Sequence, residues 1–295
     1  MPEPYRLNAP ILSVIVPMTR MAGRMANLDR WLFNSGDLPI TIVIVHDIQD
    51  ALTAVELRNL VAKYSHLEIE MIEGTYGAPG LARNAGLKRP LATWTAFWDS
   101  DDLPIPRNAL KAIADTDSKT EVIIGNFIVT SDKGTETFEH GTSLETVALN
   151  PGLWRMLIRS SILEGVSFSS TQMGEDQLFL VDLNLGSRKI YFSKSLIYEY
   201  FRGKPWQLTS NQDSINDVEN TFKLVYERLR SKKNLLNVFS RIVLMRLFTT
   251  TIVRTKGAGR IGLIIRYAGT IVLLNPRVFA GYLLRLRRIQ AKKDE

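Results

Sequence analysis

Three carboxylates lie within four positions of the chain: Asp99, Asp101 and Asp102, in the segment FWDSDD at 97–102. Carboxylates this close repel one another unless a cation or hydrogen-bond donors compensate their charge. A hard divalent cation such as Mn²⁺ or Mg²⁺ binds oxygen ligands and keeps coordination positions for phosphate oxygens. The alternative is an ordinary Asp-rich turn ahead of Pro104. Because the segment directly follows an apolar strand pattern, we favour a metal and phosphate site.

A glycine-rich turn, GAPGLARNAG at 77–86, lies just upstream of these carboxylates. Where such a turn enters a helix, its backbone N–H groups can bind an anion, and Arg83 would add a fixed positive charge. An ordinary loop is again the alternative. The spacings of the P-loop and of the dinucleotide fingerprint are both absent from the sequence, so neither of those nucleotide sites is expected.

The elements that must position these residues alternate between strand and helix over the first hundred residues. Apolar, β-branched runs predict buried strands at 12–17, 40–45, 67–72 and 94–98. Amphipathic spacing predicts helices at 26–33, 53–64 and 80–88. Such a pattern indicates an α/β protein with a mostly parallel sheet covered on both faces. Ligands of these sheets bind at the carboxyl ends of the strands, where Pro17, Asp47 and Asp99 stand.

The pattern changes after Glu121. It predicts a strand pair at 122–130 and 135–140, helices at 153–158 and 176–185, and aromatic strand pieces at 191–192 and 196–201. From Asp217 onward the sequence is helical in pattern. We therefore expect a catalytic domain over 1–215, with a donor half at about 11–106 and an acceptor half at about 120–210, and a helical, basic region over 216–295.

Composition narrows the function classes. The 295 residues contain no cysteine, which excludes disulfides, cysteine-bound zinc, iron–sulfur clusters and thiol nucleophiles. The net charge of +7 is unevenly distributed. Residues 1–229 carry 22 basic and 28 acidic side chains, whereas residues 230–295 carry 15 and 2, with none acidic between Glu227 and Asp294. An acidic body is therefore followed by a basic tail.

The basic tail predicts a membrane-surface partner. Its apolar stretches at 242–253 and 261–274 are shorter than the roughly 20 residues that span a bilayer, and each contains an arginine. The start of the chain shows no targeting pattern. We expect the tail to lie on an anionic membrane surface, with a packed helical bundle or an oligomer interface as the alternatives. No nucleic-acid partner is expected, because no groove-reading motif accompanies the charge.

Taken together, these segments resemble glycosyltransferase family 2, the GT-A nucleotide-sugar transferases. The matching motifs follow in the family's order and spacing over 11–106: SVIVP at 13–17, IVHD at 44–47, RNAG at 83–86 and FWDSDD at 97–102. A weaker continuation over 150–210 includes WRMLIRSS at 154–161, Phe168 and GEDQLF at 174–179. The resemblance implies a GT-A fold, meaning a Rossmann-like, mostly parallel sheet with helices on both faces.

The resemblance also implies the donor-binding residues. Asp47 would contact the base of the donor nucleotide, with Pro17 and Thr19 shaping that pocket. Arg83 would lie near the nucleotide or its diphosphate. Asp99 would contact the ribose of the donor, and Ser100 is a further donor-binding candidate. Asp101, with Asp99, would ligate the Mn²⁺ or Mg²⁺ that bridges the two phosphates.

On the acceptor side, the resemblance implies that Asp176 is the general base that deprotonates the acceptor hydroxyl. Glu175, Trp154, Arg202 and Trp206 are further acceptor-side candidates, with Arg202 or Lys204 closing over the diphosphate. The alternative for Glu175 and Asp176 is that they only stabilise the N-terminus of a helix, where acidic residues are favourable.

The sequence departs from the family pattern in two loops. Met18-Thr19-Arg20 follows the first proline, and the second strand ends in HDIQD at 46–50. The base contact is therefore either Asp47 or Asp50, and the first is preferred for its position. His46 and His140 are possible metal ligands, although a structural role is the expectation for each.

These inferences predict an inverting, metal-dependent glycosyltransferase that is peripheral on the cytoplasmic face of the cell membrane. Its expected donor is a UDP-sugar, and its expected acceptor is a lipid-linked bacterial glycan such as an O-antigen or capsule precursor. A nucleotidyltransferase and a non-catalytic membrane-surface adaptor are the alternatives.

Overall fold

The computed structural model describes residues 9–49, 51–138, 143–204, 214–255, 258–274 and 280. The chain forms two compact units that interleave along the sequence. The first comprises residues 1–140, 152–172 and 188–210, and the second comprises 141–151, 173–187 and 211–295. The predicted boundary near residue 215 stays a prediction, since these units do not divide the chain at a single point.

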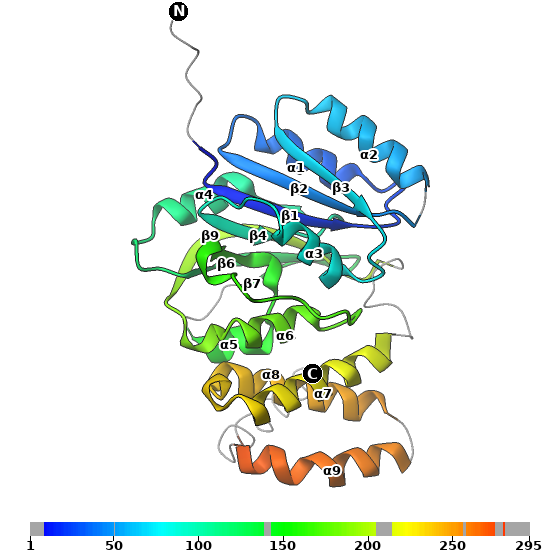
Figure 1. Ribbon diagram of the computed structural model, residues 1–295, viewed down its shortest axis with the longest axis vertical. Helices are drawn as coiled ribbons and strands as arrows, with labels where there is room; N and C mark the ends of the chain where they lie inside the picture. Colours follow the sequence, from blue (N-terminus) through cyan, green and yellow to red (C-terminus); the bar gives the residue numbers. More distant parts are fainter. Residues whose placement is uncertain are drawn as a thin grey trace, which may run out of the picture. The chain divides into compact units, whose positions relative to one another are not determined.

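The first unit is built on one mixed sheet (Figure 1). Within the described residues it has nine strands in the order β3-β2-β1-β4-β8-β6-β9-β5, with β7 paired to β6. The strands are β1 (Leu12–Met18), β2 (Ile40–Asp47), β3 (Glu68–Gly74), β4 (Trp94–Phe97), β5 (Leu103–Pro104), β6 (Val122–Ser131), β7 (Gly134–Phe138), β8 (Met156–Arg159) and β9 (Ile190–Phe201). β3, β2, β1 and β4 are parallel, as the sequence predicts.

Helices cover both faces of this parallel part. They are α1 (Ala26–Ser35), α2 (Ala51–Lys63), α3 (Pro79–Leu87) and α4 (Pro106–Ala114). Alternate residues of a strand face opposite sides of the sheet. Val14 and Val16 belong to the core cluster that includes residues of α1, α2 and α4, whereas Ile15 faces Gly86 of α3. The two-sided cover confirms the expected α/β class.

One predicted element is wrong. The sequence predicts a helix at 153–158, but the structure has a single 3₁₀ turn (Leu153–Arg155) followed by strand β8. β8 pairs antiparallel with β4 on one side and β6 on the other, so its residues are buried on a strand hydrogen-bonded along both edges. A short apolar run has no periodicity that separates a buried strand from a buried helix, and sheet pairing decides it.

The two aromatic pieces predicted at 191–192 and 196–201 form one strand, β9. β9 runs parallel to β6 with register shifts between Ile124 and Phe127, where the pairing is irregular. The hairpin of β6 and β7 turns between Ser131 and Gly134, as expected. β9 pairs antiparallel with β5, which follows the acidic segment along the chain, with Tyr198 opposite Pro104 and Glu199 opposite Leu103.

The described residues of the second unit are mainly helical. They form α5 (Leu144–Leu149), α6 (Glu175–Asp182), α7 (Ser214–Ser231), α8 (Val238–Arg254) and α9 (Ala258–Leu274). Arg246 of α8 donates to the carbonyl oxygen of Leu149 at the end of α5 (3.1 Å). Arg228 of α7 forms an ion pair with Asp182 of α6 (2.9 Å). These contacts tie α5 and α6 to the helices that follow residue 213. Among the helices that the structure describes, none is long and apolar enough to cross a membrane.

Candidate active site

The carboxyl ends of β1, β2 and β4 lie along one edge of the sheet. β1 lies between β2 and β4, with Met18 opposite His46 and Ile15 opposite Phe97. The chain passes from β1 to β2 on one side and later to β4 on the other, so the strand order reverses beside β1. Open parallel sheets bind ligands at this kind of reversal. The structure thus brings the ends of the strands that carry Pro17, Asp47 and Asp99 to a common edge.

Asp47 organises the loop that leads into α3. Its carboxylate accepts hydrogen bonds from the backbone N–H groups of Tyr76 (3.2 Å) and Gly77 (2.7 Å) and from the side chain of Gln49 (3.0 Å). The side chain is buried, with 5% of the residue exposed. Gly77 has φ +70°, a conformation that a residue with a Cβ rarely adopts. Sequence reasoning missed this role, because the partners are 29 and 30 positions away.

The neighbours of Asp47 are less enclosed. Thr19 is exposed, and its hydroxyl donates to the carbonyl oxygen of Asp47 at 3.4 Å. Pro17 is half-buried on β1. His46 is fully buried with Nδ1 3.6 Å from Glu73, which is consistent with a structural histidine. Asp50, the alternative base contact, and His140 lie outside the described residues.

Arg83 and Asp99 form an ion pair at the end of β4. Nη2 of Arg83 lies 2.7 Å from Oδ1 of Asp99, and Arg83 is buried with 6% of the residue exposed. The guanidinium carbon of Arg83 lies 5.5 Å from the centre of the Phe168 ring, a cation–π arrangement. Phe168 also packs edge-on against Phe97 (5.1 Å). Two motifs that the sequence places 16 positions apart therefore meet through one charged pair.

Asn84, the next residue of the RNAG motif, holds Phe168 in place. Its amide nitrogen donates to the carbonyl oxygen of Phe168 (2.9 Å), and its amide oxygen accepts from the N–H of the same residue (2.8 Å). This reciprocal pair joins α3 to a segment 84 positions further along. Asn84 thereby holds the backbone of the residue whose ring lies over Arg83.

Asp102 has different surroundings from the other two acids of its segment. It is 1% exposed, its Oδ2 accepts from the hydroxyl of Tyr198 (3.0 Å), and its Oδ1 accepts from the N–H of Phe201 (2.8 Å). The Tyr198 hydroxyl also accepts from the N–H of Asp99 (3.1 Å). Burial, with the charges of Asp101 and Asp99, raises the pKa of the Asp102 carboxyl well above its usual range. Burial likewise raises the pKa of Tyr198 well above its usual range.

Asp99 and Asp101 remain partly exposed, in contrast to Asp102 and Ser100, which are buried. Asn27 of α1 donates to the carbonyl oxygen of Asp101 (2.7 Å) and so fixes its backbone from a different element. Among the described residues, no group of three or more His, Cys, Asp and Glu side chains is arranged to hold a metal ion. Asp99 and Asp101 are the two carboxylates of this segment that stay partly exposed.

The acceptor-side candidates of the first unit are aromatic and basic. Trp154 stacks on Tyr198 and Tyr200, with ring centroids 4.6 Å and 5.4 Å away, and it remains partly exposed. Burial raises the pKa of Tyr200 to about 12. Arg202 is exposed just beyond β9, where its backbone N–H donates to the carbonyl oxygen of Thr130 (2.9 Å). Trp206 lies outside the described residues.

Glu175 and Asp176 begin α6 and belong to the second unit. Gly174 caps this helix with φ +81°, and an added Cβ there would lie 2.9 Å from Thr221 of α7. Glu175 is buried and Asp176 is partly exposed. Oδ1 of Asp176 accepts from the N–H of Gln177 (2.8 Å), which satisfies one of the free backbone donors of the helix start.

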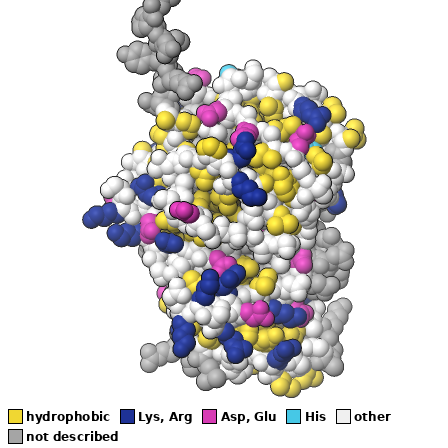
Figure 2. Space-filling model, viewed as in Figure 1, with side chains coloured by type: hydrophobic (Ala, Val, Ile, Leu, Met, Phe, Trp, Pro, Cys, Tyr) yellow, Lys and Arg dark blue, Asp and Glu magenta, His cyan; other side chains and the backbone are white. Residues whose placement is uncertain are grey.

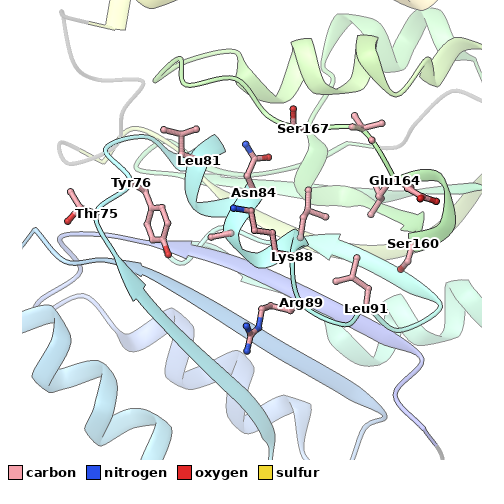
Figure 3. A pocket seen from close by; sticks show the side chains of 15 residues that line it. Thr75, Tyr76, Leu81, Asn84, Lys88, Arg89, Leu91, Ser160, Glu164 and Ser167 are labelled. Atoms are coloured by element: carbon pink, nitrogen blue, oxygen red, sulfur yellow. The ribbon is translucent and has the colours of Figure 1, made fainter.

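An open cavity of about 850 Å³ lies beside α3 in the first unit (Figure 3). Tyr76, Asn84 and Lys88 line one side of it, and Ser160 and Glu164 line the other. None of the donor residues expected from the sequence lines this cavity. It shares only the loop residue Tyr76 with the surroundings of Asp47.

Comparison with known proteins agrees with this architecture. Residues 13–174, more than half of the chain, match the family model described as Glycosyl transferase family 2. No curated protein sequence matches the chain.

Solved structures give the same fold. S. aureus TarS residues 1–349 in complex with UDP-GlcNAc superposes with a TM-score of 0.70 at 19% identity, covering 91% of this chain and 83% of that chain. The UDP complex of the same TarS fragment gives a TM-score of 0.66 at 19% identity, covering 91% and 82%. The mannosyltransferase PcManGT from Pyrobaculum calidifontis, in complex with GDP-Man and Mn²⁺, gives 0.58 at 12% identity, again covering 91% and 82%.

Proposed function

The chain belongs to glycosyl transferase family 2, and from that membership we propose an inverting, metal-dependent transfer of a sugar from a nucleotide diphosphate to a hydroxyl group. The fold is GT-A, and the protein is a nucleotide-sugar glycosyltransferase. This assignment replaces the nucleotidyltransferase and adaptor alternatives. The observation that carries the finer proposal is the pair of partly exposed carboxylates, Asp99 and Asp101, beside the buried Asp102.

The proposed cation fits this pair. Mg²⁺ and similar ions are commonly held by one or two carboxylates, with phosphate oxygens of the substrate and water completing the shell. Asp102 is committed to Tyr198 and Phe201, so Asp99 and Asp101 are the carboxylates that would hold Mn²⁺ or Mg²⁺. A bound divalent cation would stabilise the negative charge that develops on the leaving diphosphate.

The donor nucleotide would lie along the edge formed by β1, β2 and β4. Pro17, Thr19 and Asp47 would form the base pocket, with the carboxylate of Asp47 holding the loop at Tyr76 and Gly77 in shape. Arg83 would position the carboxylate of Asp99 for the ribose or the cation and add positive charge near the diphosphate. We propose a UDP-sugar as the donor, in line with the UDP-GlcNAc held by TarS, whereas PcManGT holds GDP-Man.

In the proposed reaction, the carboxylate of Asp176 accepts the proton of the acceptor hydroxyl as that oxygen bonds to the anomeric carbon. The bond between the anomeric carbon and the diphosphate oxygen breaks in the same displacement, and the nucleoside diphosphate leaves with the electron pair. One displacement inverts the anomeric configuration. The proposed acceptor is a lipid-linked bacterial glycan such as an O-antigen or capsule precursor, with Trp154, Glu175, Arg202 and Trp206 as further candidates for contacts on that side.

The test is nucleotide binding with and without the cation. We expect UDP to raise the Tm of the wild-type protein substantially more with Mn²⁺ than without it, since a ligand that binds only the native state stabilises it. Asp101→Ala should abolish this Mn²⁺-dependent part of the shift and the transfer of sugar. Asp115→Ala, which removes an exposed carboxylate at the end of α4, is the matched control and should retain both. An Mn²⁺-dependent shift of wild-type size in Asp101→Ala would contradict the metal assignment.

A further inference from the structure

Helix α9 is attached to the second unit along one face. Tyr267 is 7% exposed, and its ring packs edge-on against Phe222 (5.0 Å) and Tyr226 (5.1 Å) of α7. Ile271, one turn further along, is 1% exposed. These contacts fix the rotation of α9 about its axis and so determine which of its residues face outward.

The outward face of α9 is apolar. Ile261, Ile264 and Ile265 are 61%, 40% and 75% exposed, and their i, i+3, i+4 spacing places them on one stripe of the helix. Figure 2 shows hydrophobic side chains at the surface over this helix. Single exposed hydrophobic side chains are ordinary, but a contiguous apolar stripe on a helix usually marks an interaction surface. We call these three residues the isoleucine stripe.

The charge around the isoleucine stripe favours one kind of partner. Residues 230–295 carry 15 basic and 2 acidic side chains, and none is acidic between Glu227 and Asp294. Arg266 is exposed on α9 beside the stripe. A second copy of the chain would bring two such basic regions together, which like-charge repulsion opposes. An anionic lipid surface instead attracts them.

We propose that α9 docks on an anionic bilayer surface, with the isoleucine stripe inserted among the lipids and the basic side chains of the tail at the headgroups. Because Tyr267 holds one face of the 17-residue helix against α7, α9 would lie in the plane of the interface with the isoleucine stripe toward the lipids. Docking there would hold the enzyme at the surface that carries a lipid-linked acceptor, such as the inner face of the cell membrane. Docking of α9 on a bilayer does not require the proposed reaction.

The experiment is co-sedimentation of the full-length protein with vesicles. We expect the wild type to bind phosphatidylglycerol-containing vesicles about tenfold more tightly than pure phosphatidylcholine vesicles, because anionic headgroups supply the electrostatic part of the binding. The variant Ile261→Gln, Ile264→Gln, Ile265→Gln keeps the charge and a good helix-forming side chain, yet should weaken binding about tenfold through the lost apolar contact.

The matched control replaces three exposed hydrophobic residues of the first unit, Phe33, Leu52 and Val55, with Gln. It should bind the anionic vesicles like the wild type. Wild-type binding by the stripe variant would overturn the proposal, as would equal wild-type binding to both kinds of vesicle. Light scattering without lipid tests for self-association. If the wild type is an oligomer and the stripe variant is a monomer, the isoleucine stripe binds a second copy of the chain, and the lipid proposal is overturned. The Mn²⁺-dependent rise in Tm caused by UDP, measured on the same variants, shows separately whether the donor site is intact.

Discussion

Asp99 and Asp102 are three positions apart, but their carboxylates have different surroundings. Asp99 pairs with Arg83 at a partly exposed position, whereas Asp102 is buried between the hydroxyl of Tyr198 and the N–H of Phe201. The Tyr198 hydroxyl connects the two, since it accepts from the N–H of Asp99 and donates to Asp102. One phenol on β9 therefore sets the backbone position of the acid that would meet the ligand.

Tyr198→Phe removes only the hydroxyl that links the N–H of Asp99 to the carboxylate of Asp102. The variant should lower the free energy of unfolding by about 1.5–3 kcal/mol, because a buried carboxylate loses a hydrogen bond. It should also reduce the Mn²⁺-dependent UDP shift, because the backbone of Asp99 loses its partner. Tyr200→Phe is the control: its ring stacks on Trp154 and is retained, so both quantities should stay near the wild type. Denaturant unfolding and thermal shift measure the two effects, and a Tyr198→Phe protein with an unchanged shift would refute the connection.

These residue-scale links explain which parts of the site the sequence could predict. Asp99, Asp101 and Arg83 stand in short motifs whose composition indicates their chemistry. The partners of Asp102 are not visible in this way, because Tyr198 is 96 positions away and looks like one more aromatic residue of a core strand. The loop-holding function of Asp47 likewise depends on backbone N–H groups, which every residue except proline has. The roles of the site residues toward a ligand stay predictions.

At the scale of elements, α3 approaches β1 closely enough to require a glycine. A Cβ added to Gly86 would lie 2.6 Å from Cγ2 of Ile15, a β-branched side chain with little rotational freedom on its strand. This close contact keeps the helix that carries Arg83 and Asn84 against the sheet. It also explains the glycine of the RNAG motif without any role in ligand binding.

Gly86→Ala should therefore destabilise the protein by about 1–3 kcal/mol through overpacking. The matched control is Gly262→Ala in α9, where an added Cβ meets no atom within 4 Å. In that exposed helix, alanine should be neutral or stabilising by up to about 1 kcal/mol, because glycine is the poorer helix former. Denaturant midpoints of the two variants are the measurement. Equal effects in both helices would show that α3 can move away from Ile15.

The sequence predicted β1, β2 and β4 well because β-branched runs between turn residues favour buried strands. It failed at 153–158, where the apolar run Met156-Leu157-Ile158 is hydrogen-bonded on both sides as β8. It also divided β9 at Ser193, a polar residue whose hydroxyl accepts from the N–H of Ser195 within the strand. At 156–158, pairing with β4 and β6 decided the structure. In β9, pairing with β6 on both sides of residues 193–195 joins the two pieces, although these residues are not themselves paired in register with β6. No local pattern carries this information.

At the scale of the whole molecule, the proposed donor residues belong to the first unit, whereas Asp176 belongs to the second. Asp176→Asn keeps the size of the side chain and an oxygen that can accept from the N–H of Gln177. We expect the variant to retain the wild-type Mn²⁺-dependent UDP shift and to lose transfer by a factor of about 10² or more, as removal of a general base does. Sugar transfer to acceptor measures the second effect. Wild-type turnover would remove Asp176 as the base, and a lost UDP shift would assign it to donor binding.

The net charge of +7 is the sum of an acidic part and a basic part of the chain. The acidic excess lies in residues 1–229, which include both the carboxylate pair and Asp176, and the basic excess lies in residues 230–295, which include all of α8 and α9. A nucleic-acid partner, which the total charge alone would suggest, is not required. The two signs suit the two ligands that we propose, a divalent cation at the carboxylates of the first unit and an anionic lipid surface at α9.

The interleaving of the two units has a consequence for how such enzymes can recombine. The chain changes unit at 140–141, 151–152, 172–173, 187–188 and 210–211, and α5 and α6 depend on later helices through Leu149 with Arg246 and Asp182 with Arg228. A graft that exchanged only the residues after 210 would leave these two helices against foreign partners. The C-terminal helices are therefore not a detachable module. They would have to be inherited together with α5 and with α6, the helix that bears Asp176.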